Sequence, residues 1–343
     1  MDTSQTLVCV TGASGFIGTH VVRALRARGY SVRATVRDPR DRSKVDHLRA
    51  LGDVDIVPGD LMRPGSFDAA LKDCAYVIHT ASPVLMTARD PERDIVQPAI
   101  QGTRNVLESV VKARTVRRVV VTSSIAAVYD LSRPPAYVFT EGDWNEAALK
   151  EALPYPKSKV LAERAALQFK DSLPAREQFE LTVINPTFVL GPVDAEIHLR
   201  TSPDLIRTIM NKKISLAPDF FFNFVDVRDV AEAHVRAMVV PAEQLEARYI
   251  CYADQLHMDD VCNLLADAFP ERFRGRWRVP NPLVYAYAAF DRRLTWAYLR
   301  QSLGRRIHID NRRARQSLGL AFRPVNETIV DTARSMVELG LVR

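Results

Sequence analysis

The sequence lacks the marks of several protein classes. Its four cysteines, Cys9, Cys74, Cys251 and Cys262, are far apart and show no metal or redox spacing, so we expect reduced core thiols. No stretch reaches 18 uninterrupted apolar residues, and no basic segment or cleavage site precedes the early run "TLVCV". We therefore expect no membrane span, no secretory signal and a cytoplasmic location. The motifs HExxH and GxSxG are also missing, which argues against metalloprotease and hydrolase activity and predicts no metal site.

The composition is that of an ordinary globular protein, with 47% hydrophobic and 26% charged residues among 343. The net charge of +6 is uneven, because residues 271–315 hold twelve arginines against three acidic residues. No nucleic-acid-binding module surrounds these arginines, so we interpret them as solvated surface, with an anionic substrate or partner as the alternative.

Short β-rich apolar runs alternate with helical patterns through the first half of the chain. The expected strands are residues 6–11, 30–36, 54–58, 76–81, 118–124 and 180–185. This order predicts an α/β, doubly wound Rossmann fold with a parallel sheet. Residues 222–240 and 247–253 are expected to return to the sheet. We expect an NADP-binding domain at 1–185, joined by 224–252, and a smaller, mainly helical substrate-binding lobe at 186–223 and 253–343.

A glycine-rich turn, "TGASGFIGTH", joins the first expected strand to the first helix. Gly12, Gly15 and Gly18 have the spacing GxxGxxG. Glycines at these points permit a tight turn and let a pyrophosphate approach the backbone at a helix N-terminus. The pattern predicts a dinucleotide site, and glycines that serve packing alone are the alternative.

The end of the second expected strand distinguishes the two nicotinamide cofactors. An NAD site uses a carboxylate there for the ribose 2′-hydroxyl, whereas an NADP site uses a cation for the 2′-phosphate. Arg37 follows the strand, and Lys44 lies at the next helix start. We therefore predict that NADP(H) is preferred, and Asp38 beside Arg37 leaves NAD(H) possible.

A Tyr-x-x-x-Lys pair opens the helical stretch "LPYPKSKVLAERAALQF". Tyr155 and Lys159 at positions i and i+4 share one helix face, so the ammonium can stabilise a phenolate. Pro156 favours a helix start at or next to the tyrosine. Ser123 and Ser124 close the fifth expected strand at the sheet edge where a nicotinamide would lie. A Tyr-x-x-x-Lys pair or a Ser-Ser pair alone is often purely structural. The occurrence of both pairs at the predicted cofactor edge is what indicates proton transfer.

These stretches show a family resemblance. Segments such as "VTGASGFIGTHVVRALRARGYSVRATVRDP", "VIHTASPV", "GTRNVLES", "YPKSKVLAERAA" and "FVDVRDVAEAH" follow in family order over residues 6–252. The chain resembles the extended short-chain dehydrogenases/reductases, and among them the dihydroflavonol 4-reductase and cinnamoyl-CoA reductase group. This implies that Tyr155 is the general acid, that Lys159 orients the nicotinamide ribose, and that Ser124 binds the substrate oxygen.

The resemblance also implies residues around these groups. For the cofactor they are Gly12, Ser14, Gly15, Phe16, Ile17 and Gly18 in the first turn, Arg37 and Lys44 at the 2′-phosphate, Asp60 and Leu61 at the adenine, Thr80, Ala81 and Ser82 at the central portion, and Ser123, Tyr155, Lys159, Pro186, Thr187 and Val189 nearer the nicotinamide. Asn105 would buttress the active site. Ser124, Tyr129 and Pro83 would contact substrate.

Departures from the group leave the substrate open. Tyr129 stands where dihydroflavonol reductases carry asparagine, and "ALPYPKSK" replaces the tyrosine motif of cinnamoyl-CoA reductases. We expect NADPH-dependent reduction of a small aldehyde or ketone, aromatic or otherwise apolar, flavanonol-like and acyl-CoA-like substrates included. The alternatives are a sugar-nucleotide epimerase or dehydratase and a non-catalytic NADP sensor. We expect a monomer or homodimer without nucleic-acid or membrane partners, and structural roles for His79 and His234.

Overall fold

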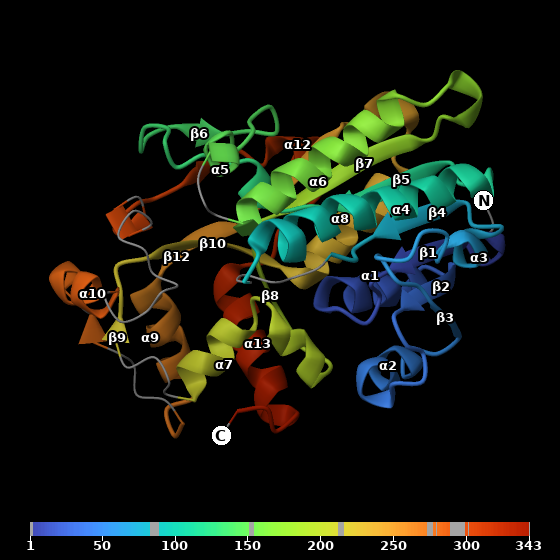
Figure 1. The fold of residues 1–343 in the computed structure, drawn as a ribbon. Coiled ribbons are helices and arrows are strands. Elements are labelled where there is room, and N and C mark those ends of the chain that lie inside the picture. Colours follow the sequence, from blue (N-terminus) through green and yellow to red (C-terminus); the bar gives the residue numbers. More distant parts are fainter. Residues whose placement is uncertain are drawn as a thin grey trace.

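The structure is a computed structural model that describes residues 3–82, 89–150, 154–211, 216–272, 277–278, 280–288, 299–300 and 302–342. Its largest sheet has seven parallel strands in the order β11-β7-β5-β4-β1-β2-β3 (Figure 1). They are β1 (Leu7–Thr11), β2 (Ser31–Val36), β3 (Val54–Pro58), β4 (Tyr76–His79), β5 (Arg118–Thr122), β7 (Glu180–Pro186) and β11 (Arg248–Cys251). The predicted doubly wound fold is therefore confirmed. β4 and β5 end two residues earlier than predicted; after β5 the chain turns at Ser124 into the short helix η3 (Ile125–Ala127).

Helices cover both faces of this sheet. On one face α1 (Phe16–Ala27) packs against α8 (Val227–Val239), and on the other α4 (Gln97–Ala113) packs against α6 (Pro154–Asp171). The smaller α2 (Arg42–Arg49) and α3 (Asp68–Leu71) follow β2 and β3. In β1, Val8 and Val10 belong to the core under α1 and α8, whereas Cys9 belongs to the core under α4. This alternation shows that the strand is buried on both faces, which explains its uninterrupted apolar sequence.

The C-terminal half adds smaller elements beyond the sheet edge. β8 (Phe188–Leu190), β10 (Phe221–Asp226) and β12 (Asp254–His257) form a second sheet, and α13 (Val325–Glu338) packs against it and against α7 (Asp204–Met210) and α9 (Met258–Ala268). The prediction that the strand of 222–240 rejoins the large sheet is wrong for β10, which instead pairs with β8 and β12. The following α8 does cover the large sheet, and β11 forms its edge.

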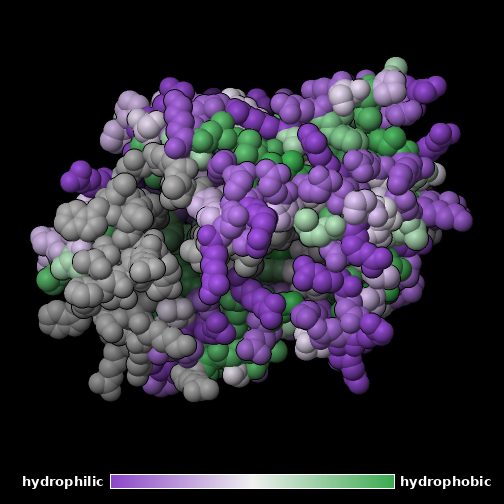
Figure 2. Space-filling view, viewed as in Figure 1, coloured by the Kyte–Doolittle hydropathy of each residue, from purple (hydrophilic) through white to green (hydrophobic). Residues whose placement is uncertain are grey.

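Short elements complete the described chain. They are η1 (Thr3–Gln5), the π-helical turn η2 (Glu92–Val96), η4 (Ala175–Glu177), η5 (Glu196–Arg200), η6 (Ala242–Gln244), α5 (Ala147–Lys150), α10 (Asn281–Ala288), α12 (Arg312–Ser317) and the two-residue strands β6 (Val138–Phe139), β9 (Leu216–Ala217), β13 (Trp277–Arg278) and β14 (His308–Ile309). Figure 2 shows hydrophilic side chains over much of the visible face, with smaller apolar areas between them. Within the described ranges, no helix combines the length and apolarity needed to cross a bilayer.

Candidate active site

The glycine turn lies between β1 and α1, at the carboxyl edge of the large sheet. Gly12 has φ of +67°, and a Cβ there would come within 2.6 Å of the Ala81 Cα. A Cβ on Gly18 would come within 2.4 Å of the Gly12 carbonyl oxygen. Gly15 is the N-cap of α1 and has no side chain to cap the first N–H groups. The turn therefore has the backbone geometry that a pyrophosphate site at a helix N-terminus requires. Ser14, Phe16 and Ile17 complete this turn.

Charged side chains follow β2 as predicted, but they differ in their partners. The Lys44 ammonium pairs with Asp41, and the Arg40 guanidinium pairs with Asp38, whose carboxyl pKa is lowered by hydrogen bonds from the Arg40 backbone and side chain. Arg37 is exposed and forms no ion pair or side-chain hydrogen bond with any residue in the described part of the chain. Of the two predicted 2′-phosphate ligands, Arg37 is thus the one without a competing carboxylate.

The tyrosine and lysine lie in the first described turns of α6, which spans Pro154–Asp171. The Lys159 ammonium lies 5.5 Å from the centroid of the Tyr155 ring. Lys159 is only 8% exposed, and its ammonium donates a hydrogen bond to the Ser82 hydroxyl at 3.0 Å. Ser82 follows β4, so this bond connects α6 to the predicted cofactor edge of the sheet.

The two serines after β5 have different environments. The Ser123 hydroxyl is buried and donates to Glu163 Oε2 at 2.5 Å, so its side chain is held in the interior. Ser124 is half-buried, caps η3 and accepts a hydrogen bond from the Ala126 N–H at 3.2 Å. Because η3 packs against α6, Ser124 lies at the same edge as Tyr155 and Lys159. The preference for Ser124 over Ser123 as the substrate ligand agrees with this placement.

Asn105 contacts the loop after β3. It is buried on α4, donates to the Leu61 carbonyl at 2.7 Å and accepts from the Gln101 amide at 2.9 Å. These contacts support the loop after β3, and no described contact joins Asn105 to Tyr155 or Lys159. Asp60 begins the same loop, where its N–H donates to the Ser66 hydroxyl. Asn105 therefore stabilises the predicted adenine loop, and its expected role as a buttress of the active site stays a prediction.

The remaining predicted residues lie at the ends of neighbouring strands. The Thr80 hydroxyl donates to the Thr11 carbonyl at 2.7 Å, which joins the ends of β4 and β1. Pro186 ends β7, and the Thr187 N–H and hydroxyl both bond to the Cys251 carbonyl of β11. Val189 is buried in β8.

The predicted substrate contacts are only partly described. Tyr129 is half-buried and packs with Ile125 and Phe139 beside Ser124. Pro83 lies outside the described residues.

Comparison with known proteins identifies the chain. Residues 9–263 match the 3-beta hydroxysteroid dehydrogenase/isomerase family. The chain belongs to this family. It is thus an oxidoreductase of the extended short-chain dehydrogenase/reductase type, related to the cinnamoyl-CoA and anthocyanidin reductases.

Individual relatives match almost the whole chain. A cinnamoyl-CoA reductase of Medicago truncatula is 34% identical over 97% of this chain and 96% of its own length. The NADPH-dependent methylglyoxal reductase GRE2 of Saccharomyces cerevisiae is also 34% identical, over 96% of this chain and 98% of its own. A crystal structure of yeast methylglyoxal/isovaleraldehyde reductase Gre2 complexed with NADPH superposes with a TM-score of 0.81, at 30% identity over 98% of this chain and 99% of that one.

Histidines around the glycine turn of this family member were not among the predicted residues. The Thr19 hydroxyl donates to the Ala13 carbonyl and bonds His198 at 3.3 Å and His47 at 3.2 Å. Burial lowers the pKa of His198 to about 3, so this imidazole is neutral and links η5 to the turn. The expected structural roles of His79 and His234 are confirmed, because both are buried and hydrogen-bonded to threonines. No local sequence signal connects residues 19, 47 and 198, because their contact depends on the tertiary fold.

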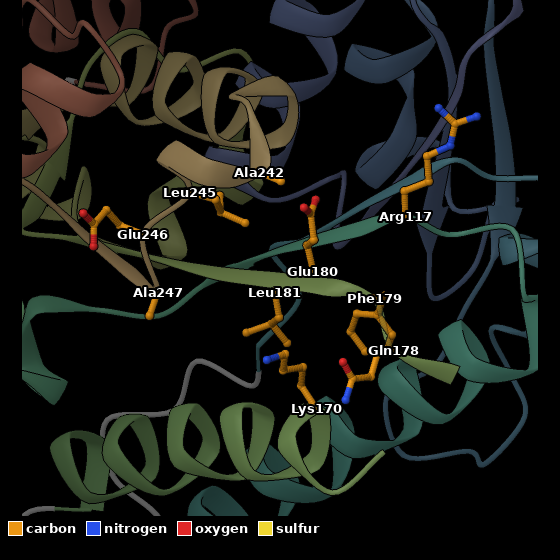
Figure 3. A pocket seen from close by; sticks show the side chains of 10 residues that line it. All are labelled: Arg117, Lys170, Gln178, Phe179, Glu180, Leu181, Ala242, Leu245, Glu246 and Ala247. Carbon is orange, nitrogen blue, oxygen red and sulfur yellow. The ribbon is translucent and has the colours of Figure 1, made fainter. Parts of the chain in front are cut away.

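A cavity of about 450 Å³ lies at the opposite edge of the sheet from this oxidoreductase site (Figure 3). Its lining residues lie near the end of α6, at the start of β7 and in the segments that precede β5, β7 and β11. They are Arg117, Lys170, Gln178, Phe179, Glu180, Leu181, Ala242, Leu245, Glu246 and Ala247. The glycine turn and Ser124 lie at the carboxyl ends of the strands, where doubly wound folds bind their ligands. The cavity therefore does not belong to the candidate active site.

Proposed function

We propose that this protein reduces the carbonyl group of a small aldehyde or ketone, with NADPH as the reductant. The observation that carries the proposal is the Lys159 ammonium, 8% exposed as a residue, 5.5 Å from the Tyr155 ring centroid and bonded to Ser82. A buried cation beside a phenol stabilises the phenolate that remains after proton donation. Tyr155 is therefore proposed as the general acid.

The roles of the other residues follow from their placement. Bound NADPH would supply the hydride that adds to the carbonyl carbon. Tyr155 would give its hydroxyl proton to the carbonyl oxygen, and the Ser124 hydroxyl would donate a hydrogen bond to the same oxygen. Lys159 would stabilise the tyrosinate, while its contact with Ser82 holds the ammonium at the cofactor edge. The products are an alcohol and the oxidised cofactor.

The preference for NADPH rests on Arg37 and on the turn around Gly12. The fit of a dinucleotide is supported by the close approach of Gly12 to Ala81, which leaves no room for a side chain. Arg37 offers a cation for a 2′-phosphate at the end of β2, and no residue in the described ranges forms an ion pair with it. The related methylglyoxal reductase GRE2 of Saccharomyces cerevisiae is NADPH-dependent, and the yeast Gre2 structure contains NADPH. A sugar-nucleotide epimerase would favour NAD and an acidic residue at this position, so Arg37 argues against that alternative.

For the substrate we propose a chemical class and no single compound. Phe188 and Phe222, with ring centroids 5.5 Å apart, lie in the small sheet that follows Pro186, and both are half-buried. These rings support an apolar or aromatic substrate beside the nicotinamide pocket. We propose that residues 186–223 and 253–343 form the substrate-binding lobe. The cytoplasmic location and the monomeric or homodimeric state stay predictions.

The test is an assay of NADPH and, separately, NADH oxidation against a defined panel. The panel contains methylglyoxal, cinnamaldehyde, dihydroquercetin, cinnamoyl-CoA and a UDP-sugar. We expect turnover of at least one carbonyl compound with NADPH and loss of at least 100-fold in kcat in Tyr155→Phe. Tyr76→Phe is the matched control, because Tyr76 begins β4 at the opposite edge of the sheet. Unchanged turnover in Tyr155→Phe would refute the catalytic assignment.

A further inference from the structure

A third polar residue continues the line of Tyr155 and Lys159 along α6. Glu163 follows Lys159 by four residues and Tyr155 by eight, so the three side chains lie along one face of the helix. The Glu163 side chain has no exposed surface. Acidic side chains are rarely buried without partners, because an uncompensated charge in the interior costs several kcal/mol. The partners of Glu163 therefore show what this buried charge holds together.

Three donors from three neighbouring strands meet at this carboxylate. Oε2 accepts the Ser123 hydroxyl at 2.5 Å and the Asn185 side-chain amide at 2.8 Å, and Oε1 accepts the Arg248 Nε at 2.6 Å. Ser123 follows β5, Asn185 lies near the end of β7, and Arg248 begins β11. One side chain thus attaches the helix of the tyrosine and lysine to three adjacent strands.

Two of these contacts bear directly on Ser124. The Asn185 amide that donates to Glu163 also donates to the Ser124 carbonyl at 3.2 Å. Ser123, whose hydroxyl donates to the same Glu163 Oε2, directly precedes Ser124 in the chain. Both bonds therefore hold the two residues whose backbone positions the Ser124 hydroxyl at the start of η3, which packs against α6.

Arg248 extends the network to the other side of this segment. Its guanidinium donates to the carbonyls of Glu141 and Asp143 and lies 4.0 Å from the Trp144 ring centroid. The neighbouring Asn145 donates through its side chain to the Ala126 carbonyl at 2.9 Å and through its N–H to the Ala127 carbonyl at 3.0 Å. The loop held by Arg248 thus supports η3, directly after Ser124.

We propose that Glu163 is a positioning residue for carbonyl reduction: its carboxylate, neutralised by Arg248, fixes Ser124 relative to Tyr155 and Lys159. It acts through the Ser123 hydroxyl and the Asn185 amide, and takes no part in proton transfer. The inference rests on the proposed function, because the position of Ser124 affects turnover only if its hydroxyl binds the substrate oxygen.

The test crosses Glu163→Gln with Ser124→Ala and measures kcat, KM and the NADPH Kd. The assay uses the panel compound that the wild-type protein reduces fastest. We expect each single variant to lose at least tenfold in kcat while its NADPH Kd changes less than twofold. The double variant should turn over as slowly as Ser124→Ala, because Glu163 has no Ser124 hydroxyl left to position. An equal loss from Glu163→Gln in both backgrounds would overturn the proposal, since it would indicate a general defect.

A control variant exists at the starts of β5 and β7. Glu180 at the start of β7 also accepts from a buried arginine, Arg118, at 2.6 Å, but at the opposite edge of the sheet. Glu180→Gln should lower the Tm and leave the kcat of the folded protein within twofold of wild type. If it lowers kcat as much as Glu163→Gln does, loss of an ion pair to a buried arginine explains both results and positioning is refuted.

Two further outcomes separate this inference from the proposed function. If Ser124→Ala is inactive but Glu163→Gln is fully active, only the positioning role is refuted. If Ser124→Ala is fully active, the proposal that Ser124 binds the substrate oxygen is refuted, and the positioning role of Glu163 is refuted with it. Should Glu163→Gln not fold, Ser123→Ala replaces it in the cross, because this variant keeps the ion pair with Arg248. Its expected loss in kcat is three- to tenfold in the wild-type background and absent with Ser124→Ala.

Discussion

The proposed preference for NADPH depends on one side chain at the end of β2, which makes Arg37→Ala the most informative cofactor variant. Arg37 is exposed and has no ion-pair partner in the described chain, whereas Lys44 is paired with Asp41. A 2′-phosphate at Arg37 would therefore displace no existing ion pair. A 2′-hydroxyl, as in NADH, carries no charge for the guanidinium to bind. The substitution should affect the two cofactors differently.

The magnitude follows from the exposure of the guanidinium. A hydrogen bond to a charged group contributes about 1.5–3 kcal/mol, and solvent screening at an exposed position favours the lower half of this range. A loss of about 1.5–2 kcal/mol corresponds to a rise of about 10- to 30-fold in Kd. We therefore expect the NADPH Kd of Arg37→Ala to rise by this factor and the NADH Kd to stay within twofold. The difference should shrink at 1 M salt, where the screening length falls to about 3 Å.

The measurement is a fluorescence titration of each variant with NADPH and with NADH at low and high salt. Arg40→Ala is the matched control, because its side chain is 91% exposed and already paired with Asp38. That variant should bind NADPH within twofold of wild type. An equal change in both Kd values for Arg37→Ala would refute the reasoning. A larger effect from Lys44→Ala would place the phosphate at α2 instead.

Two further predictions concern the backbone at Gly12 and Pro156, and a third concerns the buried His234. Gly12→Ala should lower the Tm and weaken NADPH binding at least tenfold, because its Cβ would lie 2.6 Å from the Ala81 Cα; unchanged NADPH titration would contradict this. Pro156→Ala should lower kcat more than it raises the NADPH Kd, since the proline helps to fix the helix start beside Tyr155; equal effects would contradict the argument. Burial lowers the pKa of His234 from 6.5 to about 4, so the unfolded chain binds more protons between these values, and stability falls as the pH drops through them. This loss is about 1.6 kcal/mol between pH 6.5 and 5, because the unfolded imidazole is already half protonated at pH 6.5. It can be measured by urea unfolding, and His234→Leu should reduce it.

The alternation of apolar runs and helical patterns was enough to predict the large sheet. Each predicted strand among the first six is present, because strands buried on both faces carry continuous apolar sequence. β10 was assigned to the wrong sheet for a physical reason. Its pairing with β8 and β12 is a nonlocal choice between two sheets, and Phe221–Asp226 would suit either. Strand sequence indicates that a segment pairs, but not with which partner.

The candidate site shows the same limit at the level of side chains. Motif spacing was enough to place Tyr155 and Lys159 on one face of α6 and Gly12 at a left-handed turn. Asn105 bonds the Leu61 carbonyl, 44 residues away, which no local pattern encodes. Ser123 and Ser124 are adjacent and have the same side chain, so the sequence could not distinguish their environments. The contact that separates them, from the Ser123 hydroxyl to Glu163, forms only when α6 packs against β7 and η3.

β5, which leads to the proposed substrate ligand Ser124, is joined to β7 near its start by the buried Arg118 and near its carboxyl end by the buried Glu163. At the start of β5 and β7, Arg118 pairs with Glu180 in the same register pair, and its guanidinium also donates to three carbonyls at the end of α8. Near their carboxyl ends, Glu163 joins Ser123 to Asn185 and pairs with Arg248. A shift of one residue between β5 and β7 would break the contacts at both ends and turn buried side chains to the other face. The register that places Ser124 beside η3 and α6 is therefore specified twice, which suits the proposed site, where the Ser124 and Tyr155 hydroxyls would meet one substrate oxygen.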